Sequence, residues 1–247
     1  MYQHFYKIYD RVTNQSKYPE WKKFTLEKAH DLGLTPKSVL DLACGTCSNS
    51  ILYAQQGIKV TGVDQSKGML GIAAEKFADQ GLKAKLFNHS FYKMDFAQKS
   101  DLAICHDFST NHILSSKLFV RFVRNVYEHL NAGGVFVFDI KPRGDWEKKF
   151  SQYSEFIKVD DRYSYRWQTD FDKEDDALIH LKFVLRVTGK DGRAKEHVEN
   201  NTERIYGMEE LCLIIAKSGF KLIKIYGNYG KSEPTEDSKF WVFVLQK

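Results

Sequence analysis

Residues 39–46 read VLDLACGT, a short apolar run that ends in a glycine turn. The run is too short for a helix, and consecutive apolar residues are typical of a parallel strand buried on both faces. A glycine directly after such a strand lets the backbone approach a ligand closely, because no side chain stands in the way. The stretch therefore predicts a buried strand that leads through a ligand-binding turn into a helix.

The same pattern of strand and helix recurs along much of the chain. Further strands are predicted at 59–64, 84–88, 102–106, 135–140, 221–229 and 240–245. Helices are predicted at 48–56, 69–80, 118–130 and 208–217, and an earlier one begins near Pro19 and ends at Gly33. This alternation predicts an α/β fold with a doubly wound, Rossmann-like sheet.

Past residue 150 the apolar residues alternate instead of following a helical period. Strands are predicted at 163–171, 179–187 and 194–205, and we expect them to form a small three-stranded antiparallel sheet with one apolar face. The chain is accordingly divided into an N-terminal helical cap (1–35), an α/β domain (36–145 and 206–247) and an antiparallel β insert (146–205) that acts as a lid.

The composition fits one large domain with an elaboration. Of the 247 residues, 43% are hydrophobic, which is enough for a sizeable core. The net charge of +5 comes from 37 basic and 32 acidic residues mixed along the chain, without the concentrated basic stripe of a nucleic-acid binder. The chain contains no apolar run of membrane-spanning length and no signal peptide. We therefore expect a cytoplasmic protein that binds neither nucleic acid nor membrane.

Cys44 and Cys47 form a Cys-x-x-Cys pair, a spacing found in redox and zinc sites. A zinc site needs two further ligands at short spacing, and Cys105 and Cys212 stand apart from each other and from this pair. We therefore expect reduced thiols and no metal site.

Asp64 ends the second predicted strand, 19 residues after Gly45. In a doubly wound sheet, an acidic side chain at this place accepts hydrogen bonds from the ribose hydroxyls of an adenosine. Dinucleotide-dependent oxidoreductases use the same geometry, but their turn carries several glycines around a pyrophosphate. Here Cys47 stands where a second glycine would be, and Asp41 repels phosphate but can help to hold an ammonium group. A zwitterionic amino-acid tail fits this turn better than a pyrophosphate does.

Three segments together resemble the motifs of class I S-adenosylmethionine-dependent methyltransferases. They are residues 39–46 (VLDLACGT), 60–70 (VTGVDQSKGML) and 130–136 (LNAGGVF). The resemblance implies S-adenosylmethionine as the cofactor. It also implies a seven-stranded, mostly parallel sheet whose last strand, near Phe240, runs antiparallel.

The resemblance further implies roles for single residues. Gly45 underlies the methionine moiety, Asp64 binds the ribose, and Gln65 and Met69 flank the adenine. The predicted cofactor-binding residues are Tyr9, Asp41, Ala43, Gly45, Asp64, Gln65, Met69, Asn88, His89 and Cys105.

Two positions depart from the pattern of this family. Cys47 stands where a glycine is usual, which implies a tighter or more crowded loop. After the third strand the family often places an aspartate that meets the adenine amino group, and here Asn88 and His89 occupy that stretch. Asn88 or a backbone carbonyl could substitute for it.

As a whole, the chain resembles a bacterial subgroup that includes sugar N,N-dimethyltransferases. In those enzymes a histidine after the fourth strand and an N-terminal tyrosine approach the acceptor amine. The spacing from Cys105 matches the histidine to His112, and Tyr2 matches the tyrosine, while Tyr9 belongs to a Tyr-Asp pair shared with relatives. The turn after the fourth strand lacks the Pro-Pro of adenine-methylating enzymes, which speaks against nucleic-acid bases as acceptors.

The sequence therefore predicts methyl transfer to a nitrogen or oxygen of a small molecule, by a monomer or a homodimer. Two alternatives stay open. One is a catalytically silent protein that binds S-adenosylmethionine as a regulator or scaffold, and the other is a nucleotide-dependent oxidoreductase. The insert residues that could roof the acceptor pocket are Tyr165, Trp167, His197, Glu199 and Arg204.

Overall fold

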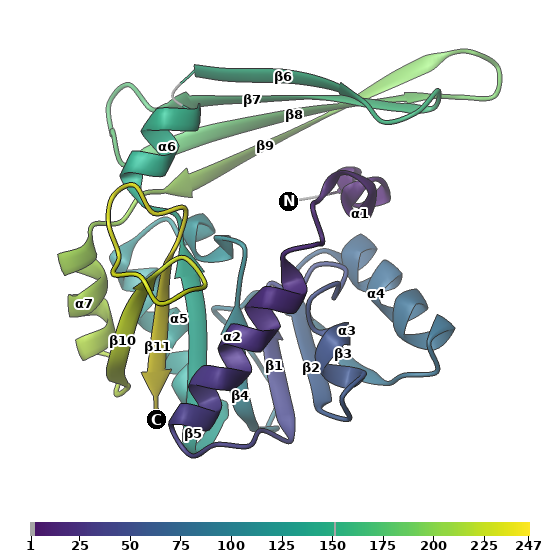
Figure 1. Ribbon diagram of the computed structural model, residues 1–247. Coiled ribbons are helices and arrows are strands. Elements are labelled where there is room, and N and C mark those ends of the chain that lie inside the picture. Colours follow the sequence, from purple (N-terminus) through teal and green to yellow (C-terminus); the bar gives the residue numbers. More distant parts are fainter. Residues whose placement is uncertain (1–2, 151) are drawn as a thin grey trace.

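Two sheets, one lying over the other, organise the molecule (Figure 1). The computed structural model describes residues 3–150 and 152–247. The larger sheet has seven strands in the order β10-β11-β5-β4-β1-β2-β3, and the smaller has four in the order β6-β7-β8-β9. The larger sheet confirms the predicted Rossmann-like α/β fold.

The larger sheet is mostly parallel. Its strands are β1 (Ser38–Leu42), β2 (Lys59–Asp64), β3 (Ala84–Asn88), β4 (Ser100–Cys105), β5 (Leu130–Ile140), β10 (Lys221–Gly227) and β11 (Trp241–Gln246). Strands β1 to β5 pair in parallel, while β11 runs antiparallel to β5 and to β10, as predicted for the last strand. The turns after β1, β2 and β4 therefore meet at one edge of the sheet, where ligands bind in such folds.

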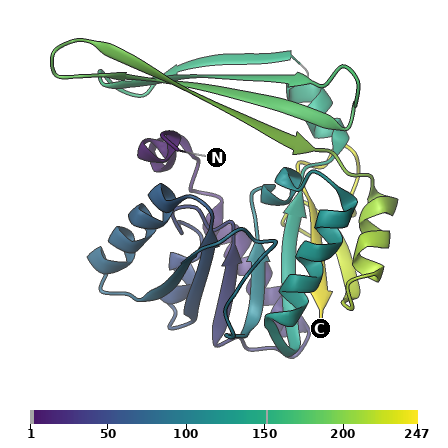
Figure 2. The ribbon, with the colours of Figure 1, turned by 180° about the vertical axis from the view of Figure 1, so that it is seen from behind.

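Helices cover both faces of this sheet (Figures 1 and 2). They are α1 (Tyr9–Val12), α2 (Tyr18–Asp31), α3 (Ile51–Ala54), α4 (Lys67–Asp79), α5 (Ser116–Glu128), α6 (Arg143–Phe150) and α7 (Met208–Ala216), with short 3-10 helices η1 (Phe5–Lys7) and η2 (Ser109–His112). Trp21 of α2, Tyr53 of α3 and Phe77 of α4 pack in the core of one face. Phe122 of α5 and Leu211 of α7 pack in the core of the other.

The smaller sheet has one strand more than the sequence predicts. It consists of β6 (Gln152–Lys158), β7 (Tyr163–Phe171), β8 (Leu178–Thr188) and β9 (Ala194–Arg204). The expectation of three strands was wrong, because β6 adds an edge strand that pairs with β7. In β6 the apolar and polar residues do not alternate. Ile157 packs in a core cluster, but the adjacent Phe156 is also apolar and is 62% exposed. The pattern by which the other strands are recognised is therefore missing.

The smaller sheet lies across the carboxyl-end edge of the larger one (Figures 1 and 2). The N-terminal segment, with η1 and α1, lies between this sheet and α4 (Figure 1). Phe5 and Ile8 of this segment pack with Tyr165 of β7 and Leu185 of β8. The space in which ligands are expected is therefore bounded by three separate parts of the chain.

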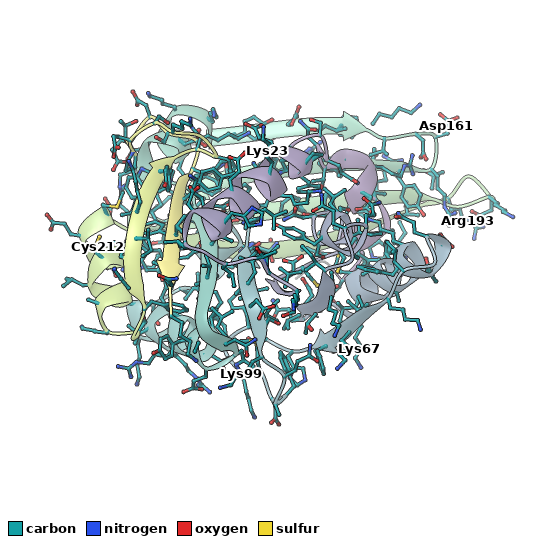
Figure 3. All side chains as sticks on the ribbon, turned by 60° about the horizontal axis from the view of Figure 1, so that its bottom comes forward. Lys23, Lys67, Lys99, Asp161, Arg193 and Cys212 are labelled. Carbon is teal, nitrogen blue, oxygen red and sulfur yellow. The ribbon has the colours of Figure 1, made fainter. Side chains whose placement is uncertain are left out.

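Charged side chains project around the outline of the molecule. Figure 3 shows the labelled Asp161 and Arg193 on one side of it and Lys67 and Lys99 toward its lower edge. Within the described ranges, no helix is long and apolar enough to cross a membrane.

Gly68 and Gly71, both in α4, offer a matched test of the contact between the N-terminal segment and α4. A Cβ on Gly68 would lie 2.6 Å from the Tyr6 ring, whereas one on Gly71 meets nothing within 4 Å. Alanine in a helix is favoured over glycine by about 0.5–1 kcal/mol, so Gly71→Ala should raise the free energy of unfolding. Gly68→Ala should lose this gain because the Tyr6 ring must move. Urea unfolding compares the two variants, and equal stabilities would contradict the contact.

Candidate active site

The turn after β1 contains three residues in the left-handed conformation. Ala43, Gly45 and Cys47 have φ values of 54°, 53° and 57°. Two of them carry a side chain, and this conformation costs such residues roughly 1–2 kcal/mol each. The Gly45 amide donates a hydrogen bond to the Asp64 carboxylate at 2.9 Å, which fixes the turn against the end of β2.

Cys47, which replaces the usual glycine, fits because a glycine stands opposite it. A Cβ on Gly62 of β2 would lie 2.9 Å from the Cys44 sulfur and 3.2 Å from the Cys47 sulfur. The missing side chain at Gly62 therefore makes room for both thiols. All four cysteines are free. Among the residues that the structure describes, no three potential ligands gather into a metal site.

Asp64 connects the turns after β1 and β2. One carboxylate oxygen accepts a hydrogen bond from the Gly45 amide at 2.9 Å, and the other accepts one from the Ser66 amide at 2.8 Å. Burial raises the pKa of this carboxyl, and the two amides oppose the rise. The Gln65 amide also donates to the carboxylate. A carboxylate has about four lone-pair sites, so Asp64 keeps acceptor capacity for a ribose hydroxyl.

A cavity of about 310 Å³ lies between these turns and the smaller sheet. The predicted site residues that line it are Tyr9, Ala43, Gly45, Asp64, Gln65, Met69 and His112. Asp41 lines a smaller space of about 50 Å³, which shares Tyr9, Ala43 and Gly45 with the large cavity. Burial raises the pKa of Asp41 to about 7. The folded chain thus brings most of the predicted residues to one place.

Three predicted residues within the described ranges line neither of these spaces. Cys105 is fully buried in the core between the sheet and α5. The side-chain amide of Asn88 donates to the Asp64 carbonyl at 3.1 Å, and the His89 ring lies 6.0 Å from the ring of Phe87. Asn88 therefore supports the backbone of Asp64. Tyr2 falls outside the described residues.

Asp10 fixes the N-terminal segment over the turn after β1. Its carboxylate accepts a hydrogen bond from the Thr46 hydroxyl at 2.6 Å and from the Ser48 hydroxyl at 3.1 Å. It also forms an ion pair with Lys76 of α4 at 2.6 Å. These contacts place the adjacent Tyr9 in the walls of both spaces.

The turn after β4 is held by Asp139, the second-to-last residue of β5. Asp107 and Phe108 are consecutive left-handed residues, with φ values of 63° and 48°. Their amides donate to the Asp139 carboxylate at 2.9 and 2.5 Å, and the Tyr229 hydroxyl donates to it as well. Burial raises the pKa of Asp139 to about 7. Asp107 in turn pairs with Lys17 at 2.7 Å, which connects the turn to the start of α2.

His112 lies on η2, directly after this turn. The side-chain amide of Asn111 holds η2 in place, since it donates to the Arg204 carbonyl at 2.9 Å and accepts from the Lys141 amide at 3.0 Å. Nε2 of His112 lies 3.6 Å from a carboxyl oxygen of Glu203. Burial lowers the pKa of His112 to about 4. The imidazole is therefore neutral at neutral pH.

The roof of the cavity comes from the smaller sheet. Tyr165 and Trp167, two of the five insert residues considered for it, line the cavity. The roof residues that the sequence analysis missed are Leu181, Phe183, Asn201 and Glu203. Asn201 lies opposite Leu181 in the pairing of β8 with β9. Asn201 and Glu203 therefore lie on the same side of the small sheet as the apolar face of β8, which the sequence predicts.

The other three insert residues have partners elsewhere. The His197 ring stacks on the His4 ring at 3.9 Å, and the Glu199 carboxylate accepts a hydrogen bond from the His4 amide at 2.6 Å. Arg204 forms an ion pair with Glu210 at 2.9 Å. They connect the insert to the rest of the chain.

Comparison with known proteins points to one class. Residues 39–134 match the protein family described as methyltransferase domain. A protein of Geobacillus sp. strain WCH70 named as a methyltransferase is 27% identical, over 100% of this chain and 99% of its own. The structure of an S-adenosylmethionine-dependent methyltransferase from Clostridium acetobutylicum ATCC 824 is 26% identical over 99% of this chain and 98% of its own, with a TM-score of 0.85. The sugar N-methyltransferase KedS8 from Streptoalloteichus sp. ATCC 53650 shares the fold, at 17% identity over 100% of this chain and 93% of its own, with a TM-score of 0.77.

The strand order, the turn after β1 and the Asp64 carboxylate define a Rossmann-like methyltransferase site. Together with these similarities, they show the fold and site of an S-adenosylmethionine-dependent methyltransferase, with S-adenosylmethionine as the cofactor. The residues present fit this cofactor, because Asp64 keeps acceptor capacity for a ribose and Asp41 lies beside Gly45 in the small space suited to an ammonium group.

Asp64→Ala removes the acceptor expected at the ribose. S-Adenosylhomocysteine should bind more weakly by about 1.5–3 kcal/mol, the usual contribution of hydrogen bonds to a charged group. Calorimetric titration measures this loss. Asp79→Ala, at the exposed end of α4, is the control and should bind like the wild type. Unchanged affinity in Asp64→Ala would contradict the assignment.

Proposed function

We propose that this enzyme methylates a nitrogen or oxygen nucleophile of a small molecule, with His112 as the base. The observation that carries the proposal is the continuity of the cavity. The same space of about 310 Å³ is lined by Gly45, Asp64 and Met69 on the cofactor side and by His112 and Trp167 on the other. A donor and an acceptor held in one enclosed space can be aligned for direct transfer.

The cofactor supplies a methyl group on a positively charged sulfur, and the carbon–sulfur bond breaks as the bond to the nucleophile forms. His112 receives the proton that the nucleophile loses. Because burial lowers its pKa to about 4, His112 is unprotonated at every pH above that value. The acidic limb of the activity profile should therefore lie well below the ordinary histidine range.

The shape of the site supports a small acceptor. The smaller sheet covers the cavity through Trp167 and Phe183, and Phe5 of the N-terminal segment also lines it. KedS8, which has the same fold, is named as a sugar N-methyltransferase, and this supports nitrogen as the methylated atom here. We accordingly assign residues 146–205 as the acceptor-side lid and 1–35 as the cap of the α/β domain formed by 36–145 and 206–247.

The free cysteines support a cytoplasmic location. Cys44 and Cys47 lie side by side over Gly62 and remain unbridged. Neighbouring thiols stay reduced in the reducing interior of the cell, whereas secreted proteins tend to form disulfides.

A catalytically silent protein that binds S-adenosylmethionine is the alternative function. It would keep the contacts around Asp64 and bind the cofactor, but it would release no S-adenosylhomocysteine with any acceptor. The neutral His112 at the cavity wall favours the active enzyme.

His112→Ala should leave the affinity for S-adenosylhomocysteine intact and lower turnover by about 10²–10⁴-fold, the usual contribution of a general base. The assay measures S-adenosylhomocysteine release with a panel of small amines and alcohols. His197→Ala, whose ring stacks on His4 instead, is the matched control. Wild-type turnover in His112→Ala would refute the role of this residue, and a wild type that is inactive with the whole panel would favour the silent alternative.

A further inference from the structure

Glu203 of β9 is a buried carboxyl that lines the cavity without a matching cation. It is 2% exposed. Its Oε2 has no hydrogen-bond partner, and its Oε1 lies 3.6 Å from Nε2 of His112. Buried polar atoms in folded proteins almost always have a partner. A ligand in the cavity can therefore supply the missing hydrogen-bond partner of this carboxyl.

The neighbouring cation is already engaged. Lys141 forms an ion pair with Asp145 at 3.3 Å, and its ammonium group lies over the rings of Phe108 and Trp146 at 4.6 and 4.4 Å. In the described part of the chain, His112 is the one basic side chain within 4.0 Å of the Glu203 carboxyl, and burial keeps it neutral.

The protonation of Glu203 follows from these surroundings. Burial raises its pKa to about 8, against the attraction of the more distant Lys141, and the charge of Asp107 adds to the rise. At neutral pH the carboxyl keeps its proton. A cation brought against it favours the ionised form, and the proton then leaves.

The groups beside Glu203 suit a ligand with a polar end and an apolar body. Asn201, two residues earlier on the same face of β9, lines the cavity, and its Nδ2 also has no hydrogen-bond partner. The rings of Phe108, Trp167 and Phe183 line the same space. Aromatic faces attract cations as well as apolar groups.

We propose that Glu203 binds the methyl acceptor and selects a basic amine. This inference rests on the proposed function and narrows its acceptor to a basic nitrogen. The amine binds as an ammonium ion against the Glu203 carboxylate. This carboxylate lies 3.6 Å from Nε2 of His112 and, once ionised, favours the charged imidazolium, so one ammonium proton passes to His112. The freed lone pair forms the bond to the methyl carbon as the carbon–sulfur bond breaks, with the electron pair of that bond staying on sulfur. The positive charge moves from sulfur to the methylated nitrogen, which Glu203 still balances.

The same geometry disfavours other acceptors by their charge. An alcohol brings no cation, so Glu203 stays protonated and gains no ion pair. A carboxylate ligand would leave Glu203 protonated and without an ion pair, and it would bring its negative charge near Asp107 in the same cavity. Discrimination therefore depends on charge and less on shape.

The sulfonium of the cofactor is the other cation that enters this cavity. If Glu203 balanced the sulfonium, its removal would weaken binding of S-adenosylmethionine and spare S-adenosylhomocysteine, which lacks that charge. The two molecules therefore distinguish an acceptor site from a cofactor site.

The test compares the wild type with Glu203→Gln, Glu203→Asp and the control Glu196→Gln, an exposed residue of the same strand. Thermal melting checks that each variant folds, and calorimetry gives its Kd for S-adenosylmethionine and for S-adenosylhomocysteine. Calorimetry on the S-adenosylhomocysteine complex at neutral pH then measures three matched pairs: benzylamine and benzyl alcohol, cyclohexylamine and cyclohexanol, tryptamine and tryptophol.

We expect at least one amine to bind the wild type at least about tenfold more tightly than its alcohol, since a hydrogen bond to a charged group is involved. Glu203→Gln should abolish this preference, Glu203→Asp should keep part of it, and Glu196→Gln should keep all of it, with both cofactor affinities unchanged. The proposal is overturned if no amine exceeds its alcohol in the wild type, if Glu203→Gln keeps the preference, or if that variant loses affinity for S-adenosylmethionine alone. If Glu203→Gln does not fold, Glu203→Asp carries the comparison, and a wild type without any amine preference overturns the proposal by itself. If His112→Ala is inactive but the wild type binds amines no more tightly than alcohols, this inference is refuted and the proposed function stands.

Discussion

The carboxylate of Asp139 holds the turn from which the site is arranged. It accepts hydrogen bonds from the amides of Asp107 and Phe108, two consecutive residues in the left-handed conformation. Each such residue costs roughly 1–2 kcal/mol, and the two hydrogen bonds from these amides to Asp139 offset that cost in part. The resulting sharp turn brings Phe108 into the cavity wall, Asp107 to Lys17, and η2 with His112 under the smaller sheet.

Carboxyl groups recur along the ligand edge of the sheet. Asp41 in β1 is buried like Asp139 in β5, Asp64 at the end of β2 is half-buried, and desolvation raises the pKa of all three. Such groups ionise more readily when a cation comes near. S-Adenosylmethionine brings two positive charges, on its sulfur and on its amino group. A pyrophosphate would instead meet carboxylates in the place where dinucleotide-binding proteins offer backbone amides. The acidic edge therefore favours this cofactor electrostatically.

What the sequence predicts depends on whether the signal is local. The periods of strands and helices and the turn at Gly45 are local features, so the α/β fold, its antiparallel last strand and the cofactor edge could be predicted. The roof could not be predicted fully, because in β9 the residues Glu199 and Glu203 are polar while Val198 is apolar and 54% exposed. Alternation alone assigns the polar face to solvent, and only the docking of the sheet turns it toward the cavity. β6 was missed for a related reason, since Phe156 lies on the exposed side of an edge strand.

The N-terminal segment connects the floor of the site to its roof. At one end, the amides of His4 and Phe5 donate to the Glu199 carboxylate of β9 at 2.6 and 3.0 Å. At the other end, Asp10 accepts from Thr46 in the turn after β1 at 2.6 Å. The segment therefore joins the turn after β1, which lines the cavity at Gly45, to β9, which lines it at Asn201 and Glu203. Both walls of the cavity are thus held together by one short stretch of chain.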